Sequence, residues 1–109
     1  MDMLREMFLK QLDLQKKLGV SNEIVGNQEY INIQALALID EIMEALRETP
    51  WKPWKKNQEF NQAKFKEELI DAWHFLINLS LSAGMTSLEV FERYLAKNKT
   101  NYNRVEENY

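Results

Sequence analysis

Hydrophobic side chains recur at three- and four-residue intervals along most of this chain, which is the period of an amphipathic helix. In the first such stretch, the residues that follow the period are Leu4, Met7, Phe8, Leu12, Leu14 and Leu18. The pattern predicts a helix from about Asp2 to Leu18, and Gly19 is well placed to end it. We expect a loop from about Val20 to Gln28 and a second helix from about Glu29 to Glu48.

Two prolines interrupt the helical pattern after the second stretch. They lie in the segment TPWKPWKKNQ as Pro50 and Pro53, where they disfavour a continuous helix. A third helix is predicted from about Asn61 to Ala83, and Gly84 supplies its stop signal. The run LIDAWHFLINLSLSAG within this helix is apolar nearly all the way round, which is typical of a helix buried on most sides.

A fourth helix follows the glycine, with Thr86 or Ser87 as its cap, and we expect it to end near Lys99. Residues 100–109, TNYNRVEENY, are polar and aromatic, and we expect them to become ordered only against a binding partner. Three glycines and two prolines are too few breakers for a fold of many strands and turns. The sequence therefore predicts an all-α bundle of about four helices, formed as a single domain by residues 1–109.

Length and composition narrow the function classes. A chain of 109 residues buries a modest share of its surface, so we expect a homodimer whose subunits form a shared bundle. The absence of cysteine removes disulfides and thiolate metal sites and fits a cytoplasmic protein. A net charge of −3 disfavours binding to a nucleic-acid polymer, and no segment resembles a signal peptide or a membrane span.

Acidic residues interrupt the two most apolar predicted helices. Glu41 and Glu44 lie one turn apart on the second helix, and Glu68 and Asp71 lie one turn apart on the third. Buried carboxylates must be paired, protonated or bound to a cation. If the two helices pack antiparallel, the four carboxylates converge, and an all-oxygen set suits Mg²⁺ or Mn²⁺ rather than Zn²⁺.

These carboxylates carry a resemblance to a known family. The motif E-x-x-E (Glu41 to Glu44), a spacer, and the motif E-x-x-D (Glu68 to Asp71) resemble the signature of the all-α NTP pyrophosphatase superfamily, which includes MazG-like proteins and the dimeric dUTPases. The resemblance implies a MazG-like helical bundle that is completed by dimerisation. It also implies Mg²⁺ bound by these four carboxylates, and cleavage of nucleoside triphosphates to monophosphate and pyrophosphate.

Three further segments resemble the dimeric dUTPases in particular. PWKPWKK resembles that family's tryptophan–lysine segment, which implies that Trp54 packs on uracil. AWHFLINLSLSAGM implies that His74 and Phe75 face the nucleoside, and LDLQKKL implies that Gln15 reads the base. The pattern K-N-x-x-N-x-x-R, followed by a tyrosine, implies a C-terminal segment that closes over the substrate and binds its phosphates. Its residues here are Lys97, Asn98, Asn101, Arg104 and Tyr109.

The resemblance therefore predicts a dUTP diphosphatase, which hydrolyses dUTP to dUMP and pyrophosphate by Mg²⁺-dependent attack of an activated water. Glu41 is our first choice for the carboxylate that activates the water, and Glu44 is the second. Lys97, Arg104 and Lys55 would hold phosphate oxygens, and the guanidinium can do so bidentately.

The residues leave two alternatives open. The first is a MazG-like pyrophosphatase for dCTP or a non-canonical nucleotide, which would differ only in its base pocket. The second is a non-enzymatic helical adaptor, in which the carboxylates form an ordinary solvated face and the tail binds a peptide.

Overall fold

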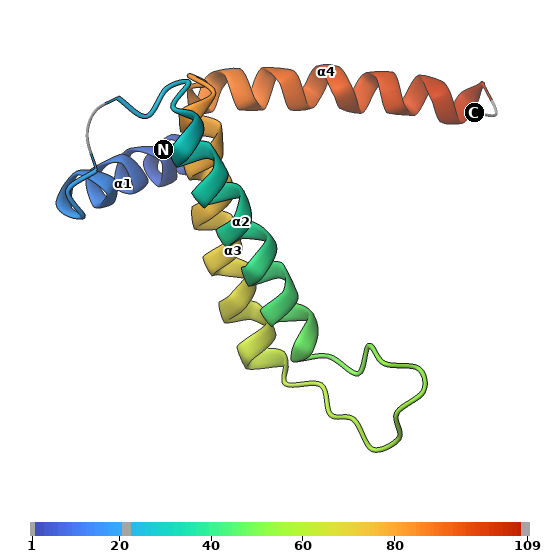
Figure 1. The fold of residues 1–109 in the computed structure, drawn as a ribbon. Helices are drawn as coiled ribbons and strands as arrows, with labels where there is room; N and C mark the ends of the chain where they lie inside the picture. The colour runs from blue at the N-terminus through green and yellow to red at the C-terminus, as the bar shows by residue number, and fades with distance from the viewer. Residues whose placement is uncertain (1, 21–22, 108–109) are drawn as a thin grey trace.

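The computed structural model describes residues 2–20 and 23–107, and this part of the chain forms four α-helices and no strand. The helices are α1 (Met3–Lys17), α2 (Gln28–Arg47), α3 (Gln62–Ser82) and α4 (Ser87–Glu106). The second and third helices lie side by side as a long antiparallel hairpin (Figure 1). At one end of this hairpin α1 packs against α3, and α4 leaves the same end and points away. The prediction of an all-α protein with four helices is confirmed.

Each helix begins at a polar side chain that caps its first turn. Asp2, Asn27, Asn61 and Thr86 hold the N-cap positions, and each accepts a hydrogen bond from the backbone N–H three residues on. A cap of this kind contributes about 1 kcal/mol. Because these signals are local, the predicted bounds of the first three helices are correct to within one residue.

The core lies where α1 meets the end of the hairpin. The hydrophobic cluster there is formed by buried side chains from α1, the α1–α2 loop, α2 and α3: they are Phe8, Ile24, Tyr30, Ile77 and Leu81. Val90, in the first turn of α4, packs against the same cluster. The start of α4 is therefore part of the core, although the rest of that helix is not.

A tight corner sets the direction of α4. Gly84 has a φ of 76°, and its N–H donates to the carbonyl of Leu81 at 3.0 Å. The N–H of Met85 donates to the carbonyl of Ser80 at 3.2 Å, which completes the two-bond pattern of a Schellman motif. Thr86 caps α4 directly after it. The two helices are thus joined by a short link whose backbone groups are hydrogen-bonded.

The predicted end of the fourth helix near Lys99 is wrong, because α4 continues to Glu106. No glycine or proline follows Gly84, so nothing in the sequence stops the helix. Thr100 is accommodated by donating its hydroxyl to the carbonyl of Ala96 at 3.1 Å. Residues 100–106, which we expected to be ordered only against a partner, are thus helical on their own. Tyr109 lies outside the described residues.

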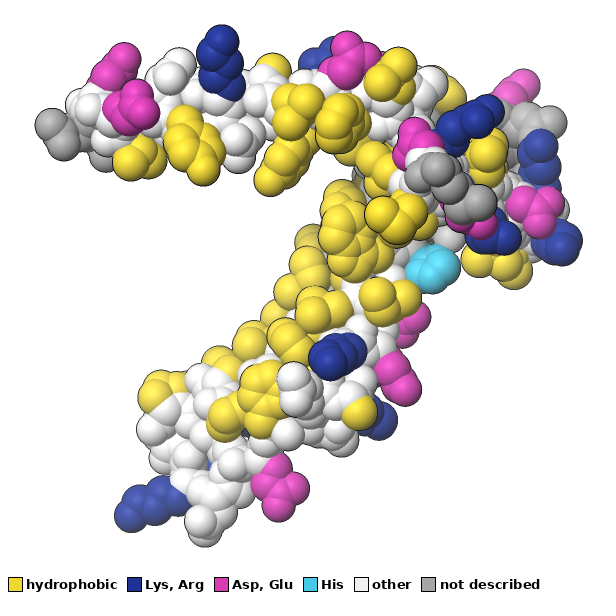
Figure 2. Space-filling model, turned by 180° about the vertical axis from the view of Figure 1, so that it is seen from behind, with side chains coloured by type: hydrophobic (Ala, Val, Ile, Leu, Met, Phe, Trp, Pro, Cys, Tyr) yellow, Lys and Arg dark blue, Asp and Glu magenta, His cyan; other side chains and the backbone are white. Residues whose placement is uncertain are grey.

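The chain has an open shape with much apolar surface. Its radius of gyration is 17.2 Å, against about 13 Å for a compact chain of this length. Its accessible surface is 8787 Å², against about 6300 Å² for a compact monomer of 13.0 kDa. Hydrophobic side chains lie along the hairpin and along one side of α4 (Figure 2). Exposed apolar surface of this extent marks an interaction site.

Among the described residues, none of the helices combines the length and the apolar character that crossing a membrane requires.

Replacing Phe8 by alanine should lower the free energy of unfolding by about 3–5 kcal/mol, because it leaves a cavity between α1 and α3. Leu9 is the matched control: it neighbours Phe8 on the same helix but is 54% exposed, so Leu9→Ala should cost about 0.5 kcal/mol or less. Urea denaturation at one fixed protein concentration measures both. Equal losses for the two variants would show that the core lies elsewhere.

Candidate metal centre

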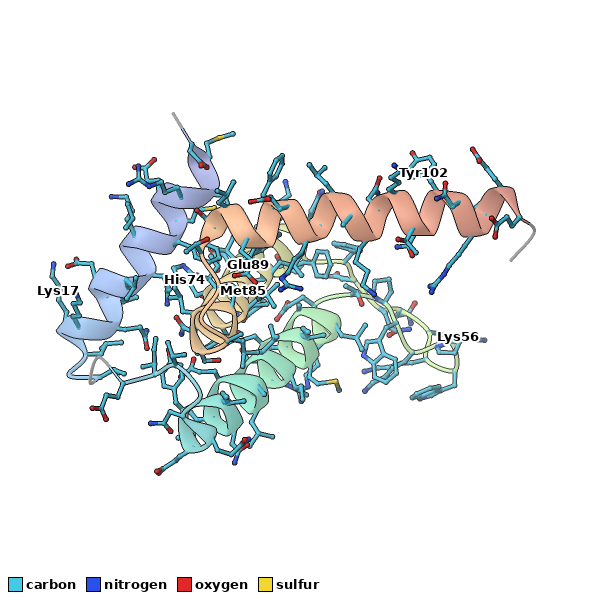
Figure 3. The ribbon with its side chains drawn as sticks, turned by 90° about the horizontal axis from the view of Figure 1, so that it is seen from above. Lys17, Lys56, His74, Met85, Glu89 and Tyr102 are labelled. Atoms are coloured by element: carbon cyan, nitrogen blue, oxygen red, sulfur yellow. The ribbon has the colours of Figure 1, made fainter. Side chains whose placement is uncertain are left out.

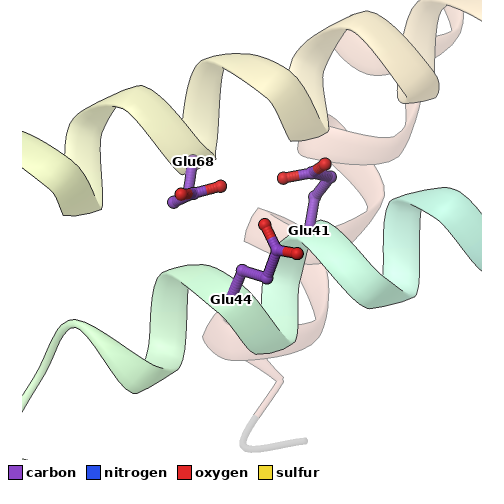
Figure 4. A group of neighbouring side chains, drawn as sticks. All are labelled: Glu41, Glu44 and Glu68. Carbon is purple, nitrogen blue, oxygen red and sulfur yellow. The ribbon is translucent and has the colours of Figure 1, made fainter.

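Three carboxylates from two helices meet in the half of the hairpin nearer the α2–α3 loop. Glu41 and Glu44 project from α2 towards Glu68 of α3 (Figure 4). One carboxylate oxygen from each lies within 4.8 Å of the other two. Asp71, one turn after Glu68, lies outside this group of three, although its charge acts on Glu41. The antiparallel packing that the sequence analysis assumed is therefore what brings the two motifs together.

Crowding of like charges perturbs these acids. Burial, a hydrogen bond with Glu68 and the negative charges of Glu44 and Asp71 raise the pKa of Glu41 from 4.5 to about 7. A hydrogen bond with Glu68 and then burial raise the pKa of Glu44. One oxygen of Glu41, Oε2, is buried and has no hydrogen-bond partner among the described residues. At neutral pH the cluster must therefore retain a proton or bind a cation.

The donor set fits a hard divalent cation. All the converging atoms are carboxylate oxygens, which suit Mg²⁺ or Mn²⁺. The buried oxygen of Glu41 could coordinate a cation between α2 and α3, and the cation would offset the repulsion among the three acids. Glu41, Glu44 and Glu68 would hold it, with Asp71 at the edge of the group.

A buried amide pair joins α2 and α3 further along the hairpin. Asn78, only 2% exposed, donates its Nδ2–H to Gln34 Oε1 at 2.8 Å, and its Oδ1 is buried without a partner among the described residues. Gln34 precedes Glu41 by seven residues, and Asn78 follows Asp71 by seven. Two turns of helix, about 10 Å, therefore separate this pair from the carboxylates. We did not predict Gln34, although its seven-residue spacing from Glu41 was the available signal.

A cavity of 450 Å³ lies between α1 and α3, beside His74. His74 Nδ1 and Gln11 Oε1 are 2.6 Å apart, and this contact joins α3 to α1. The side chains that line the cavity are Met7, Lys10, Gln11, Leu14, Ile70, Trp73, His74 and Ile77. It is an apolar cavity with a few polar groups at its edge, which is the usual form of a small-molecule site. Trp73 is half exposed and forms one wall of the cavity.

Gln15, the predicted base-reading residue, lies next to Tyr30 of α2. Gln15 is 6% exposed and accepts a hydrogen bond from the hydroxyl of Tyr30 at 2.9 Å. Gln11, one turn earlier on α1, is the glutamine that lies beside His74. Phe75 is half-buried on α3. It lies on the same face of the helix as Asp71 and Asn78, and Asn78 on this face bonds to Gln34 of α2.

The loop between α2 and α3 carries Trp54 and Lys55 beyond the tip of the hairpin (Figure 1). Trp54 is 71% exposed, and its ring meets the edge of Trp51 at a centroid distance of 5.6 Å. Gln58 holds the loop by donating to the carbonyls of Lys52 and Lys55. Within one chain, the loop lies far from the cavity beside His74, as the position of Lys56 in Figure 3 shows.

The predicted phosphate-binding residues Lys97, Asn98, Asn101 and Arg104 all lie on α4. Because α4 points away from the hairpin, one chain does not bring them to its carboxylates (Figure 1).

The electrostatics of Glu41 predict a pH effect on the cation-free protein. A folded-state pKa of about 7 against 4.5 means that the folded state binds the extra proton, so stability falls as the pH rises through this window. Glu41→Gln removes the titrating group and keeps its shape. In EDTA, the melting temperature of this variant relative to the wild type should therefore rise between pH 4.5 and 7. Glu67→Gln, an exposed neighbour of the cluster, is the control and should follow the wild type at every pH; a constant offset for Glu41→Gln would contradict the assignment.

Comparison with known proteins identifies relatives of the chain. A family model described as dUTPase matches residues 3–90. The dCTP pyrophosphatase of Enterobacteria phage LZ5 is 37% identical over 71 residues, and that of Enterobacteria phage T4 is 35% identical over 71 residues. Each alignment covers 54% of this chain and only 41% or 42% of the relative, so the chain spans about two fifths of the length of these curated relatives.

A DNA replication protein of Enterobacteria phage T4 is 36% identical over 61 residues, which cover 45% of this chain and 16% of that protein. No solved structure matches the chain significantly. The dUTPase model covers three of the four helices completely and includes all four predicted metal ligands. The chain therefore belongs to the all-α dUTPase family of the MazG-like superfamily.

Proposed function

We propose that this protein is a divalent-cation-dependent nucleoside triphosphate diphosphatase that converts dUTP to dUMP and pyrophosphate. The observation that carries the proposal is the convergence of Glu41, Glu44 and Glu68 within 4.8 Å, with the pKa of Glu41 raised to about 7. Membership of the dUTPase family supports the same chemistry.

The four carboxylates have distinct tasks in this proposal. All four would hold the cation, and Glu41 takes the proton of the attacking water, with Glu44 as second choice. Bound Mg²⁺ would neutralise charge on the phosphates during phosphoryl transfer.

The cavity between α1 and α3 is the site that we assign to the base. His74 and Gln11 offer polar groups at its edge, and Trp73 offers an aromatic wall. We keep Gln15 and Phe75 as proposed nucleoside-binding residues, although neither lines the cavity: Gln15 lies one turn after Gln11 on α1, and Phe75 directly follows His74 on α3. Trp54 and Lys55 are exposed at the tip of the hairpin, where they are accessible to base and phosphate in an assembled enzyme.

A second candidate substrate is dCTP, which the names of the two phage relatives favour. Uracil accepts a hydrogen bond at O4, whereas cytosine donates one from its 4-amino group. A glutamine amide can donate or accept, so Gln11 is compatible with both bases. Strong discrimination would require polar groups that only one base satisfies.

We also propose that the working form is a homodimer. The chain exposes about 2500 Å² more than a compact monomer of its mass, and apolar side chains contribute to that surface. Obligate interfaces bury about 2000–5000 Å² in total, so a second copy can cover it.

Light scattering at micromolar concentration should give twice the chain mass of 13.0 kDa, because one chain leaves its apolar faces exposed. Leu95→Asp introduces a charge on the exposed apolar side of α4 and should shift the mass towards that of the monomer. Lys99→Asp, on the same helix, is the control and should stay dimeric. A monomeric wild type would contradict the dimer.

Pyrophosphate release from dUTP, dCTP and the common nucleoside triphosphates, each with Mg²⁺ and with EDTA, tests the proposed activity. We expect Mg²⁺-dependent release from dUTP. Glu68→Gln should reduce it at least about a hundredfold because a ligand is lost, whereas Glu67→Gln, its exposed neighbour, should leave it unchanged. Release from dCTP alone would keep the metal site and change the base assignment. If no nucleotide releases pyrophosphate, the proposed diphosphatase activity is refuted.

A further inference from the structure

We propose that Gln34 and Asn78 are positioning residues of the carboxylate site. Their hydrogen bond fixes the register of α3 against α2, and thereby places Glu68 opposite the two acids of α2. This inference rests on the function proposed above, because it concerns the same cluster of acids. It adds which contact aligns the two helices that carry them.

The amide pair and the acids belong to one register of the antiparallel hairpin. In such a hairpin, equal steps in opposite directions along the two helices lead from one facing pair to the next. Gln34 faces Asn78, because their side chains are 2.8 Å apart. Ten residues further along α2 is Glu44, and ten residues back along α3 is Glu68. These two side chains also hydrogen-bond to each other, so one register accounts for both contacts.

Charge alone would favour a different register. In the observed one, Asp71 lies opposite Glu41, seven residues along each helix from the amide pair. Shifting α3 by one heptad would bring Lys64 to that place and move Glu68 away, so an ion pair would replace repulsion between acids. Residues 48–61 between the helices, at ~3.3 Å per residue when extended, can span such a shift of about 10 Å. Neither charge nor the loop therefore selects the observed register.

Packing alone does not explain the amide pair either. Asn78 is 2% exposed, and its Oδ1 is buried without a partner among the described residues. Turning the amide over would leave its nitrogen without a partner instead. An apolar pair of similar volume would fill the same space without this cost in stability. The best-supported role of a buried polar group between paired helices is to set their register.

Two further polar contacts, each one turn from the amide pair, support the same alignment. Tyr30 of α2 donates its hydroxyl to Gln15 of α1 at 2.9 Å. On α3, His74 Nδ1 lies 2.6 Å from the Oε1 of Gln11, which is one turn before Gln15. One contact between polar side chains thus joins each two of the three helices. If α3 slides along the hairpin, it must break both of the contacts that it makes.

A metal site needs this alignment more than the rest of the hairpin does. Its ligands come from two helices and must keep their relative positions within about 0.5 Å. Apolar contacts let one helix slide slightly against another, whereas a hydrogen bond is lost once its donor–acceptor distance grows by more than about 0.5 Å. Two turns of helix, about 10 Å, separate the amide pair from the acids. The pair therefore acts on the acids through the two helices.

Titration of the nucleotide-free protein with Mg²⁺ tests the inference. Gln34→Leu with Asn78→Leu keeps the space filled, so the melting temperature in EDTA should stay the same or rise. The dissociation constant for Mg²⁺, measured by calorimetry at pH 7, should rise at least about tenfold, because metal sites lose affinity on this scale when a group that orients their ligands is removed. An unchanged dissociation constant would overturn the inference, since a merely structural pair leaves the site intact.

Exchanging the two amides is the conservative variant. Gln34→Asn with Asn78→Gln retains an amide pair of the same total volume and should bind Mg²⁺ as the wild type does; affinity as low as that of the leucine variant would contradict a role for the hydrogen bond. Gln28→Ala with Asn32→Ala removes an exposed amide pair of α2 and should also leave the affinity unchanged. If the leucine variant does not fold, Gln34→Met decides: it removes only the acceptor of Asn78, and wild-type affinity would overturn the inference.

A metal-free measurement separates this inference from the proposed function. The same register places Ala37 opposite Phe75, three residues along each helix from the amide pair. In EDTA, the wild type should show a nuclear Overhauser effect between the Ala37 methyl group and the Phe75 ring, and the leucine variant should lose intensity there. If the wild type binds no Mg²⁺, the proposed metal site fails, and this signal still decides the register. Its absence from the wild type, or equal intensity in both proteins, would overturn the inference.

Discussion

Repulsion among carboxylates between α2 and α3 is the constraint on which the account depends. Glu41, Glu44 and Glu68 lie within 4.8 Å of one another on two helices that otherwise pair through apolar and amide side chains. Such a cluster weakens the hairpin unless a proton or a cation compensates it. A cation bound by this cluster would also neutralise phosphate charge, which is the task that metal ions have in chemistry on polyphosphates.

In the proposed function, the hairpin and α4 would divide the requirements of such a site between them. The hairpin brings acids together in a rigid, partly buried setting, and α4 carries cationic donors on an exposed arm. If both sets lay in one rigid chain, the donors could form ion pairs with the acids and compete with the cation. The proposed homodimer would leave space between the two sets for a nucleotide, because each set is held by its own helices.

Much of the fold could be predicted because its signals are local. Caps such as Asp2 and Asn61, together with a stop at Gly84, define helices within one residue. The carboxylate motifs could be predicted as a pair because i, i+3 spacing fixes a face, and only antiparallel packing had to be assumed. The end of α4 could not be predicted, because no glycine or proline after Gly84 marks where the helix stops.

The residues around the cavity beside His74 could not be predicted in full from the sequence, because tertiary packing decides which of them meet. Gln11 and Gln15 are one turn apart on the same face of α1, and only tertiary packing decides which of them meets His74 and which meets Tyr30. The direction of α4 is likewise set by the burial of Val90, a contact that no local pattern specifies. Periodicity predicts which face of a helix is apolar, but it does not predict which surface covers that face.

Calorimetric titration of the nucleotide-free protein with Mg²⁺ at pH 7, in two buffers of different ionisation enthalpy, tests the central claim most directly. With the pKa of Glu41 near 7, the account predicts saturable binding that releases protons, and loss of both signals in Glu41→Gln. Binding that is absent, or that persists unchanged in this variant, would show that the carboxylates between α2 and α3 are not a metal site.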